Sequence, residues 1–314
     1  MSPATGEVGM TTYTQRPFRD AGDAQRLLDL VYADPDGQGH VLDMPYRLSA
    51  WSLDTPDNTR LWEDASGRLA GFAIVQGPWG TLDFGASPAA RATGLEAEIM
   101  AWGVARAQAI ADRRRQPFTL ALEARADDAG RRALFQAHGF TEHGWDWLHL
   151  VRDLDEPPEA PTVPDGFRLR PLRGEAEAGA YVDVHQAAFG TRNMTLEWRQ
   201  RTLLLPQHRP DLDLVVEAPA GTLAAVCIGW LDPAGGRGQV EPLAVRPDYQ
   251  RLGLGRALLL EMFRRMRAAG ARRVSIAADA AGAAPRALYA AVGFRPQDTI
   301  EAYTRTFEPR GRRR

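Results

Sequence analysis

Two glycines at the start of a predicted helix form the part of this sequence best suited to bind an anion. Gly253 and Gly255 lie in a loop between a β-rich run and an amphipathic run. The first turn of a helix leaves backbone N–H groups unpaired at the positive end of the helix dipole, where a phosphate can bind. Glycine lets the backbone approach a phosphate closely because it has no Cβ. A glycine turn without a ligand is the alternative interpretation.

The loop differs from the two common nucleotide-binding motifs. It lacks the Gly-Lys-Ser/Thr sequence of a P-loop and the third glycine of a dinucleotide fingerprint. It reads Gln250-x-x-Gly253-x-Gly255 and is followed downstream by Tyr289-x-x-x-Gly293. This combination resembles the GNAT acyltransferase superfamily, whose first motif is Gln/Arg-x-x-Gly-x-Gly/Ala. The resemblance extends over the second half of the chain and, more weakly, over the first.

The resemblance implies that acetyl-CoA is the acyl donor. The loop amides would bind its pyrophosphate, and the strand before the loop would contact its pantetheine arm. The cofactor-binding residues implied in this way are Leu243, Ala244, Val245, Gln250, Arg251, Leu252, Gly253, Leu254, Gly255 and Arg256. The sequence departs from the family at Gly282, where many members carry an asparagine that contacts the cofactor. No metal is implied.

Acyl transfer to an amine requires a base, because a primary amine with a pKa of about 10 is mostly protonated at neutral pH. Glu241, near the start of the strand before the loop, is our candidate base, and strand alternation places it on one face with Leu243 and Val245. Tyr289, on the helix that faces the thioester in similar enzymes, is our candidate acid for the departing thiolate. A solvated strand-end carboxylate and a core-facing aromatic are the alternative interpretations of these two residues.

The elements that must position these residues alternate between helix and strand. Two β-rich runs separated by a turn-like Ala-Pro-Ala-Gly predict a hairpin, and apolar residues at helical spacing predict a helix that ends before Gly270. In the second half we predict helices at 175–189, 254–269 and 285–292, and strands at 212–217, 222–231, 239–245, 273–278 and 299–307. This order predicts an α/β (α+β layered) fold, and the resemblance implies a mixed, mostly antiparallel sheet flanked by helices.

The chain contains an internal repeat. Residues 16–19 recur as Arg-Pro-x-Arg at 170–173, and residues 138–140 recur as x-Gly-Phe at 292–294, both 154 positions later. Four prolines in the segment 155–166 predict a semi-rigid connector between the copies. We therefore predict two tandem GNAT-like domains, at 11–152 and 167–309. This layout is similar to that of mycothiol-synthase-like proteins, in which the C-terminal copy is the catalytic one.

The first copy has lost the residues that the second would use. Aligning the copies sets Gly255 against Glu96, Glu241 against Leu82 and Tyr289 against Phe135. A carboxylate where the pyrophosphate would lie opposes binding. We therefore expect 11–152 to be non-catalytic and to support the second copy, shape its acceptor cleft or mediate a homodimer. Asp83, beside Leu82, would replace the base only if the alignment slipped by one residue.

In our main hypothesis, the acetyl group is transferred to the primary amine of a small molecule. No motif identifies it, although the segment 189–213 of the second copy offers polar and aromatic residues that could line its pocket. They are Arg192, Glu197, Trp198, Arg199 and His208. Two alternatives to the enzyme are a CoA or acyl-CoA sensor without turnover, and a regulatory module whose loop binds no phosphate.

Composition limits the remaining possibilities. The 314 residues exceed most single cores, and a net charge of −2 provides no basic excess for nucleic acid or an anionic membrane. The short basic run at 310–314 is typical of a solvated terminus. Cys227, the single cysteine, excludes an internal disulfide and lies in a predicted strand, which favours a buried thiol. With no targeting pattern or long apolar segment, we expect a cytoplasmic protein.

Overall fold

One mixed sheet runs through both halves of the computed structural model, which describes residues 12–35 and 38–311. In the first half its strands are β1 (Thr14–Arg16), β2 (Thr59–Glu63), β3 (Leu69–Gln76), β4 (Thr81–Ala86), β5 (Phe118–Arg125) and β6 (Thr141–Asp153). In the second half they are β7 (Arg168–Pro171), β8 (Asp213–Glu217), β9 (Leu223–Leu231), β10 (Arg237–Val245), β11 (Arg273–Asp279) and β12 (Arg295–Phe307). The order across the sheet is β1-β2-β3-β4-β5-β12-β6-β11-β10-β9-β8-β7.

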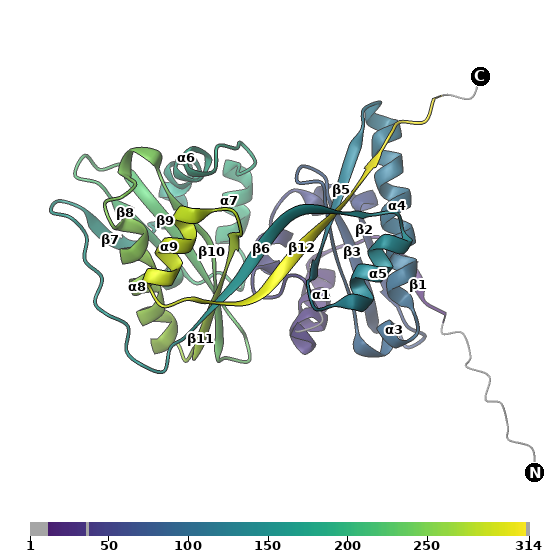
Figure 1. Ribbon diagram of the computed structural model, residues 1–314, viewed down its shortest axis with the longest axis horizontal. Helices are drawn as coiled ribbons and strands as arrows, with labels where there is room; N and C mark the ends of the chain where they lie inside the picture. Colours follow the sequence, from purple (N-terminus) through teal and green to yellow (C-terminus); the bar gives the residue numbers. More distant parts are fainter. Residues whose placement is uncertain (1–11, 36–37, 312–314) are drawn as a thin grey trace, which may run out of the picture.

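Helices cover the sheet in both halves (Figure 1). The first half contains α1 (Ala21–Ala33), α2 (Met44–Leu48), α3 (Pro88–Ala92), α4 (Leu95–Arg114) and α5 (Ala129–Ala137). The second contains α6 (Ala178–Phe189), α7 (Leu196–Leu203), α8 (Leu254–Ala268) and α9 (Ala283–Ala291). These elements match the predicted helices, strands and hairpin of the second half to within a few residues. No helix among the described residues has the length and apolarity needed to cross a bilayer.

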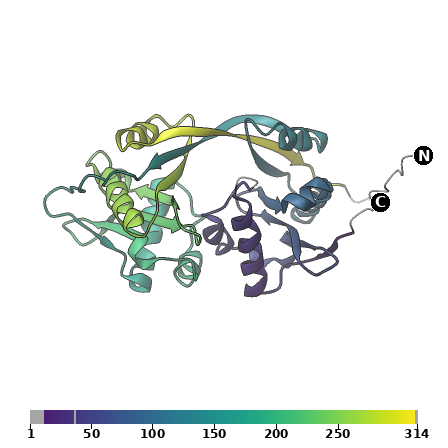
Figure 2. The same ribbon diagram turned by 90° about the horizontal axis from the view of Figure 1, so that it is seen from below.

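The two halves exchange their last strands. β12 belongs to the second half by sequence but pairs with β5 of the first, and β6 pairs with β11 of the second. The two exchanged strands also pair with each other, and they form the long ribbon that joins the lobes in Figures 1 and 2. Each of the predicted domains, 11–152 and 167–309, is one continuous stretch of sequence. In space, however, each lobe of the structure includes the last strand of the other domain. Residue 11 lies outside the described residues.

Each exchanged strand contributes to the core and to a helix end of the opposite half. Tyr303 and Phe307 of β12 are buried in the core of the first half, and Leu150 of β6 is buried in the core of the second. Arg305 of β12 donates a hydrogen bond to the His138 carbonyl after α5, and Arg152 of β6 donates to the equivalent Val292 carbonyl after α9. The exchange thus follows the internal repeat.

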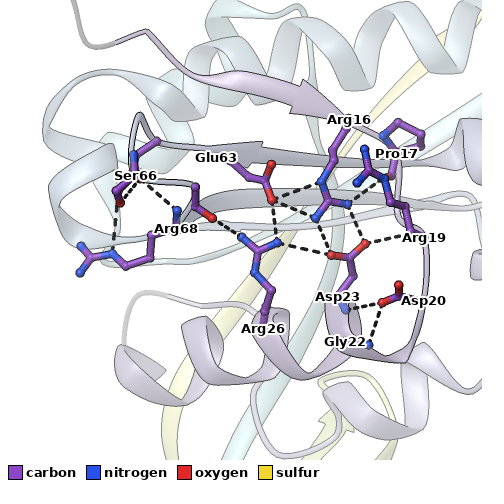
Figure 3. Close-up of polar contacts among 12 residues, drawn as sticks. Arg16, Pro17, Arg19, Asp20, Gly22, Asp23, Arg26, Glu63, Ser66 and Arg68 are labelled. Carbon is purple, nitrogen blue, oxygen red and sulfur yellow. Dashed lines mark hydrogen bonds and ion pairs between the residues drawn. The ribbon is translucent and has the colours of Figure 1, made fainter.

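The sequence repeat also appears as a repeated ion-pair network. In the first half Arg16 binds Asp23 at 2.6 Å and Glu63 at 2.9 Å, and Arg26 joins the same carboxylates (Figure 3). In the second half Arg170 binds Glu177 and Glu217, each at 2.6 Å. Each partner lies 154 positions from its counterpart. The recurring Arg-Pro-x-Arg segment therefore joins the first strand, the first helix and a neighbouring strand in both halves.

The connector between the halves lies outside any helix or strand from 154 to 167. Arg267 of α8 donates to the backbone carbonyls of Leu154 and Asp155, and Arg256 forms an ion pair with Glu159 at 2.5 Å. The proline-rich segment is therefore attached to α8 at two points. Its second contact involves a residue of the glycine loop.

Candidate active site

Glu241 lies at an irregularity in the central strand of the second half. Along β10 and β9 the register runs from Val240 opposite Gly229 directly to Leu243 opposite Cys227, so two residues of β10 face one residue of β9. This is a β-bulge formed by Glu241 and Pro242, whose peptide bond is cis. The indole of Trp230 donates a hydrogen bond of 2.7 Å to the Glu241 carbonyl. The bulge, which simple alternation does not predict, gives Glu241 its position in the strand.

Glu241 has the electrostatic properties of a base that works near neutral pH. Burial and, to a lesser extent, the nearby Asp43 carboxylate raise the pKa of its carboxyl to about 7, against the opposite effects of Arg47 and His40. All three neighbours belong to the first half. A carboxylate with this pKa is partly ionised at neutral pH and can accept a proton there.

Tyr289 lies on α9 and is 8 % exposed. Its ring packs edge-to-face against Phe294 with the centroids 5.8 Å apart. Burial raises the pKa of its hydroxyl above the usual value, and the Glu241 carboxylate raises it further. The raised pKa keeps the hydroxyl protonated at neutral pH. Within the described residues it has no hydrogen-bond partner in the protein, so it is available as a donor.

The glycine loop ends at the N-terminus of α8, as predicted. Gly253 is the residue before the helix and has φ +78°, and the first helical bond runs from the Ala257 N–H to the Gly253 carbonyl at 3.0 Å. Arg251 is also left-handed, with φ +63°. Gln250, Arg251 and Leu252 are exposed, so the turn before the helix faces solvent.

Gly255 has a packing reason to be glycine. A Cβ there would lie 3.1 Å from Leu288 Cδ2 and 3.6 Å from Val245 Cγ2. These contacts show that the start of α8, the end of β10 and helix α9 meet at this point. The predicted loop, the predicted strand and the helix that carries Tyr289 are therefore neighbours.

The strand residues assigned to the pantetheine arm lie beside an opening in the sheet. β10 pairs with β11 in parallel only from Arg237 to Gln239. Leu243, Ala244 and Val245 come after this point, where the two strands no longer pair, and they alternate between half-buried and buried positions. Their backbone on the β11 side is thus not used by the sheet, as an extended ligand would require.

Most of the residues suggested for the acceptor pocket do not line one. Arg199 is fully buried, forms an ion pair with Asp213 and stacks over the Tyr181 ring at 3.9 Å. His208 binds the same Asp213 at 2.9 Å, Trp198 is buried, and Glu197 forms a surface ion pair with Arg201. Arg192 lines a polar groove with Asp183, Gln186 and Arg246. The structure gives these buried residues a role in packing.

The first half has the same backbone features but different side chains. Gly94 precedes α4 with φ +84°, as Gly253 precedes α8. Glu96 occupies the place of Gly255 and binds Arg131 of α5 at 2.8 Å. Phe135, in the place of Tyr289, is fully buried against Tyr303 of the exchanged strand β12. The start of α4 therefore carries a carboxylate that is paired with Arg131, where the start of α8 has a glycine.

The predicted match between Glu241 and Leu82 is wrong by one residue. In β4 and β3, Leu82 faces Val75 and Phe84 faces Ala73, with Asp83 alone between them. Val75 and Ala73 correspond to Gly229 and Cys227, so Leu82 matches Val240 and Asp83 takes the place of the bulged pair Glu241–Pro242. The extra residue in the bulge shifts the alignment, which a comparison of sequences without register does not detect. The first half thus keeps a carboxylate at the position of the candidate base.

Asp83 is held differently from Glu241. Arg47 donates to both of its oxygens, at 2.6 and 2.9 Å, and Gln76 donates to it at 2.7 Å. Arg47 holds the pKa of the buried Asp83 carboxyl below its ordinary value against the effect of burial. Asp83 is therefore a fixed ion-pair partner, and it is not poised to accept a proton near neutral pH.

Comparison with known proteins places this geometry in a family. Residues 179–294 match the model of the acetyltransferase (GNAT) family. The mycothiol acetyltransferase of Clavibacter michiganensis subsp. michiganensis is 30 % identical over 308 residues, which cover 91 % of this chain and 96 % of the relative. The chain belongs to the GNAT acetyltransferase family. It is an N-acetyltransferase, and GNAT enzymes use acetyl-CoA as co-substrate.

Solved structures of GNAT proteins share the whole fold. A GCN5-related N-acetyltransferase from Sphaerobacter thermophilus aligns with a TM-score of 0.66 and 25 % identity, over 95 % of this chain and 96 % of its own. A tandem GNAT protein from the clavulanic acid biosynthesis pathway also aligns with a TM-score of 0.66, at 18 % identity, over 96 % of this chain and all of its own. The predicted tandem GNAT fold is confirmed.

Proposed function

We propose that this GNAT protein transfers the acetyl group of acetyl-CoA to the primary amine of a small molecule, and that the reaction takes place in its second half. The observation that carries the proposal is the convergence of Glu241, Tyr289 and the open start of α8 around the place where β10 and β11 separate. In the first half the equivalent position near the start of α4 holds the Glu96 carboxylate, which would repel a pyrophosphate and is paired with Arg131.

The residues of the second half supply each requirement of acyl transfer. The amides at the start of α8 bind the pyrophosphate, aided by Arg251 and by Arg256 once it leaves Glu159. Glu241 removes a proton from the acceptor ammonium, and the free amine attacks the thioester carbonyl to form a tetrahedral intermediate. The intermediate collapses with cleavage of the C–S bond, and Tyr289 donates its proton to the departing thiolate. The attacking nitrogen loses its second proton, which restores the Tyr289 hydroxyl, and Glu241 releases its proton to solvent. The products are the acetamide and CoA.

The acceptor that best fits the relatives is a small amine of the mycothiol type. The Clavibacter relative, similar over nearly its whole length, is named a mycothiol acetyltransferase. We therefore propose the form of mycothiol that lacks the acetyl group as the first acceptor to assay. The lack of helices suited to cross a membrane in the described residues and the near-neutral charge of the chain are compatible with a small solute as substrate.

The experiment that tests this function measures CoA release and acetylated product together, with acetyl-CoA and a panel of amines that includes this acceptor. We expect turnover in the wild type and at least about 100-fold less in Glu241→Gln. Calorimetric titration with acetyl-CoA is the parallel measurement. Binding without turnover on any amine would instead support an acyl-CoA sensor, and absence of binding would contradict both.

A further inference from the structure

Helix α2 of the first half packs against Trp230, the residue of β9 that binds the backbone of the Glu241 bulge. The ring of Tyr46 lies 5.9 Å from the ring of Trp230, centroid to centroid, and Trp230 donates its hydrogen bond to the Glu241 carbonyl. Trp198 of the second half donates to the Tyr46 carbonyl at 3.2 Å. The candidate base is thus bordered by an element from the half that lacks an open cofactor site.

Three charged side chains from this part of the first half are held in fixed geometry. His40 and Asp43 bind each other at 2.8 Å. Arg47 is clamped by the two oxygens of Asp83 and lies over the Trp79 ring, with its guanidinium carbon 4.8 Å from the centroid. Gln76 in turn holds Asp83. These contacts therefore hold the guanidinium of Arg47 in one position, although the side chain is long and has many rotatable bonds.

We propose that His40, Asp43 and Arg47, with Asp83 as the anchor of Arg47, form a positioning unit of the first half that sets the charge of the catalytic base Glu241. The inference rests on the proposed role of Glu241. In this account Asp83, the carboxylate at the position of Glu241 in the first half, binds and orients the Arg47 guanidinium. The first half takes part in catalysis through the second half's base without binding the reacting atoms itself.

The three side chains act on Glu241 with opposite signs. Asp43 has the largest effect and favours the protonated form of Glu241, whereas Arg47 and His40 favour the carboxylate. The other titratable groups that interact with Glu241 are neutral near pH 7, because burial raises the pKa of each. They are Tyr46, Tyr181, Cys227 and Tyr289. The charge that acts on the base therefore comes from the first half.

The test is the pH dependence of kcat/KM for CoA release in the full-length chain, which reports the pKa of the free enzyme's base. Arg47→Met removes a cation, so we expect the rising limb to move to higher pH by about half a unit. Asp43→Asn removes an anion, so we expect it to move to lower pH. Asp43 also raises the pKa of His40, so Asp43→Asn changes the charge of His40 as well. The substitution is therefore repeated in a His40→Gln background, where only the charge of Asp43 is removed.

Matched variants separate this role from simple destabilisation. Arg47→Met leaves Asp83 buried and unpaired, so Arg47→Met with Asp83→Asn removes both charges, and we expect the same upward shift. Arg47→Lys keeps the cation, and we expect it to restore part of the wild-type limb. The control is Arg16→Met, which breaks a similar ion-pair network on β1, at the far edge of the sheet, and we expect no shift.

Opposite shifts for the Arg47 and Asp43 variants, with Arg16→Met at the wild-type position, would support the unit. The proposal would be overturned if the rising limbs of the folded Arg47 and Asp43 variants stayed within about 0.1 pH unit of the wild-type limb. It would also be overturned if both limbs moved in the same direction. Full activity in Glu241→Gln would contradict the proposed base itself, so the two failures are distinguishable.

Discussion

The two halves of this protein share a fold and differ in the residues near the start of one helix and in the bulge of one strand. α4 and α8 each follow a left-handed glycine, but Glu96 near the start of α4 binds Arg131, whereas the equivalent Gly255 of α8 has no side chain and packs against Val245 and Leu288. The ion pairs of Arg16 and Arg170 are the same in both. The fold therefore rests on features that both halves keep, and in the proposed function the chemistry depends on a few positions that only the second half has.

The comparison also shows why the first half is needed. Its β5 and β6 pair with the last strand of the chain, and its helix α2 borders the base of the second half. A half without an open cofactor site still supplies a strand to the other lobe and charges near Glu241. In the proposed function the first copy is not catalytic, and it then has a structural and electrostatic role.

The largest effect should come from ending the exchange of strands. A chain that stops before β12 loses the strand between β5 and β6 and loses Tyr303 and Phe307 from the core of the first half. We expect it to lack a cooperative unfolding transition in circular dichroism and to aggregate in size-exclusion chromatography. A chain that ends just after β12 is the control and should fold. A folded, monomeric fragment 12–153 would show that the halves do not depend on each other.

Copying the first half's carboxylate into the second should abolish cofactor binding. In Gly255→Glu a negative charge lies at the start of α8 and the side chain meets Leu288. We expect the Kd for acetyl-CoA to rise at least about 100-fold in calorimetric titration. Gly255→Ala is the matched variant without the charge, and it should weaken binding less because the end of the Leu288 side chain can move. An unchanged Kd in Gly255→Glu would mean that the pyrophosphate binds elsewhere.

Removing the hydroxyl that the first half lacks should slow the reaction without affecting cofactor affinity. We expect Tyr289→Phe to lower kcat by about 10- to 100-fold, with little change in the KM for acetyl-CoA, since the acid acts on the leaving thiolate. The reverse change, Phe135→Tyr, should add no activity because Phe135 is fully buried. Equal rates for Tyr289→Phe and the wild type would remove Tyr289 from the mechanism.

The smallest effect is expected for the ion pair that occupies the first helix start. Glu96→Gln breaks the contact with Arg131, and both side chains are largely buried. We expect the melting temperature to fall by a few degrees, as for a loss of about 1 kcal/mol, and kcat to stay within about twofold of the wild type. A large loss of kcat in this folded variant would indicate that the first half has a reactive site of its own.

Local signals in the sequence predicted most of the second half. The hairpin of β8 and β9, the amphipathic α8 and the glycine at its start depend on residues close together in the chain, and all three are present. The buried Cys227 is also as expected. The basic run at the end of the chain falls partly outside the described residues.

Long-range features could not be predicted in the same way. The residues of β6 and β12 suit a sheet in either half, so their composition does not reveal which neighbour they pair with. The bulge at Glu241 adds one residue to β10, which moved the predicted equivalent from Asp83 to Leu82. The approach of Asp43 and Arg47 to Glu241 joins segments from different halves and follows only from the packing of α2.

The most direct test of the account compares the two carboxylates that the register makes equivalent. CoA release is measured across the pH range for Glu241→Gln and Asp83→Asn, with folding checked for both. We expect Glu241→Gln to lose at least about 100-fold in kcat and to lose the rising limb near pH 7, while Asp83→Asn loses less than about tenfold. If Asp83→Asn is inactive and Glu241→Gln keeps its activity and pH limb, the assignment of the chemistry to the second half is contradicted.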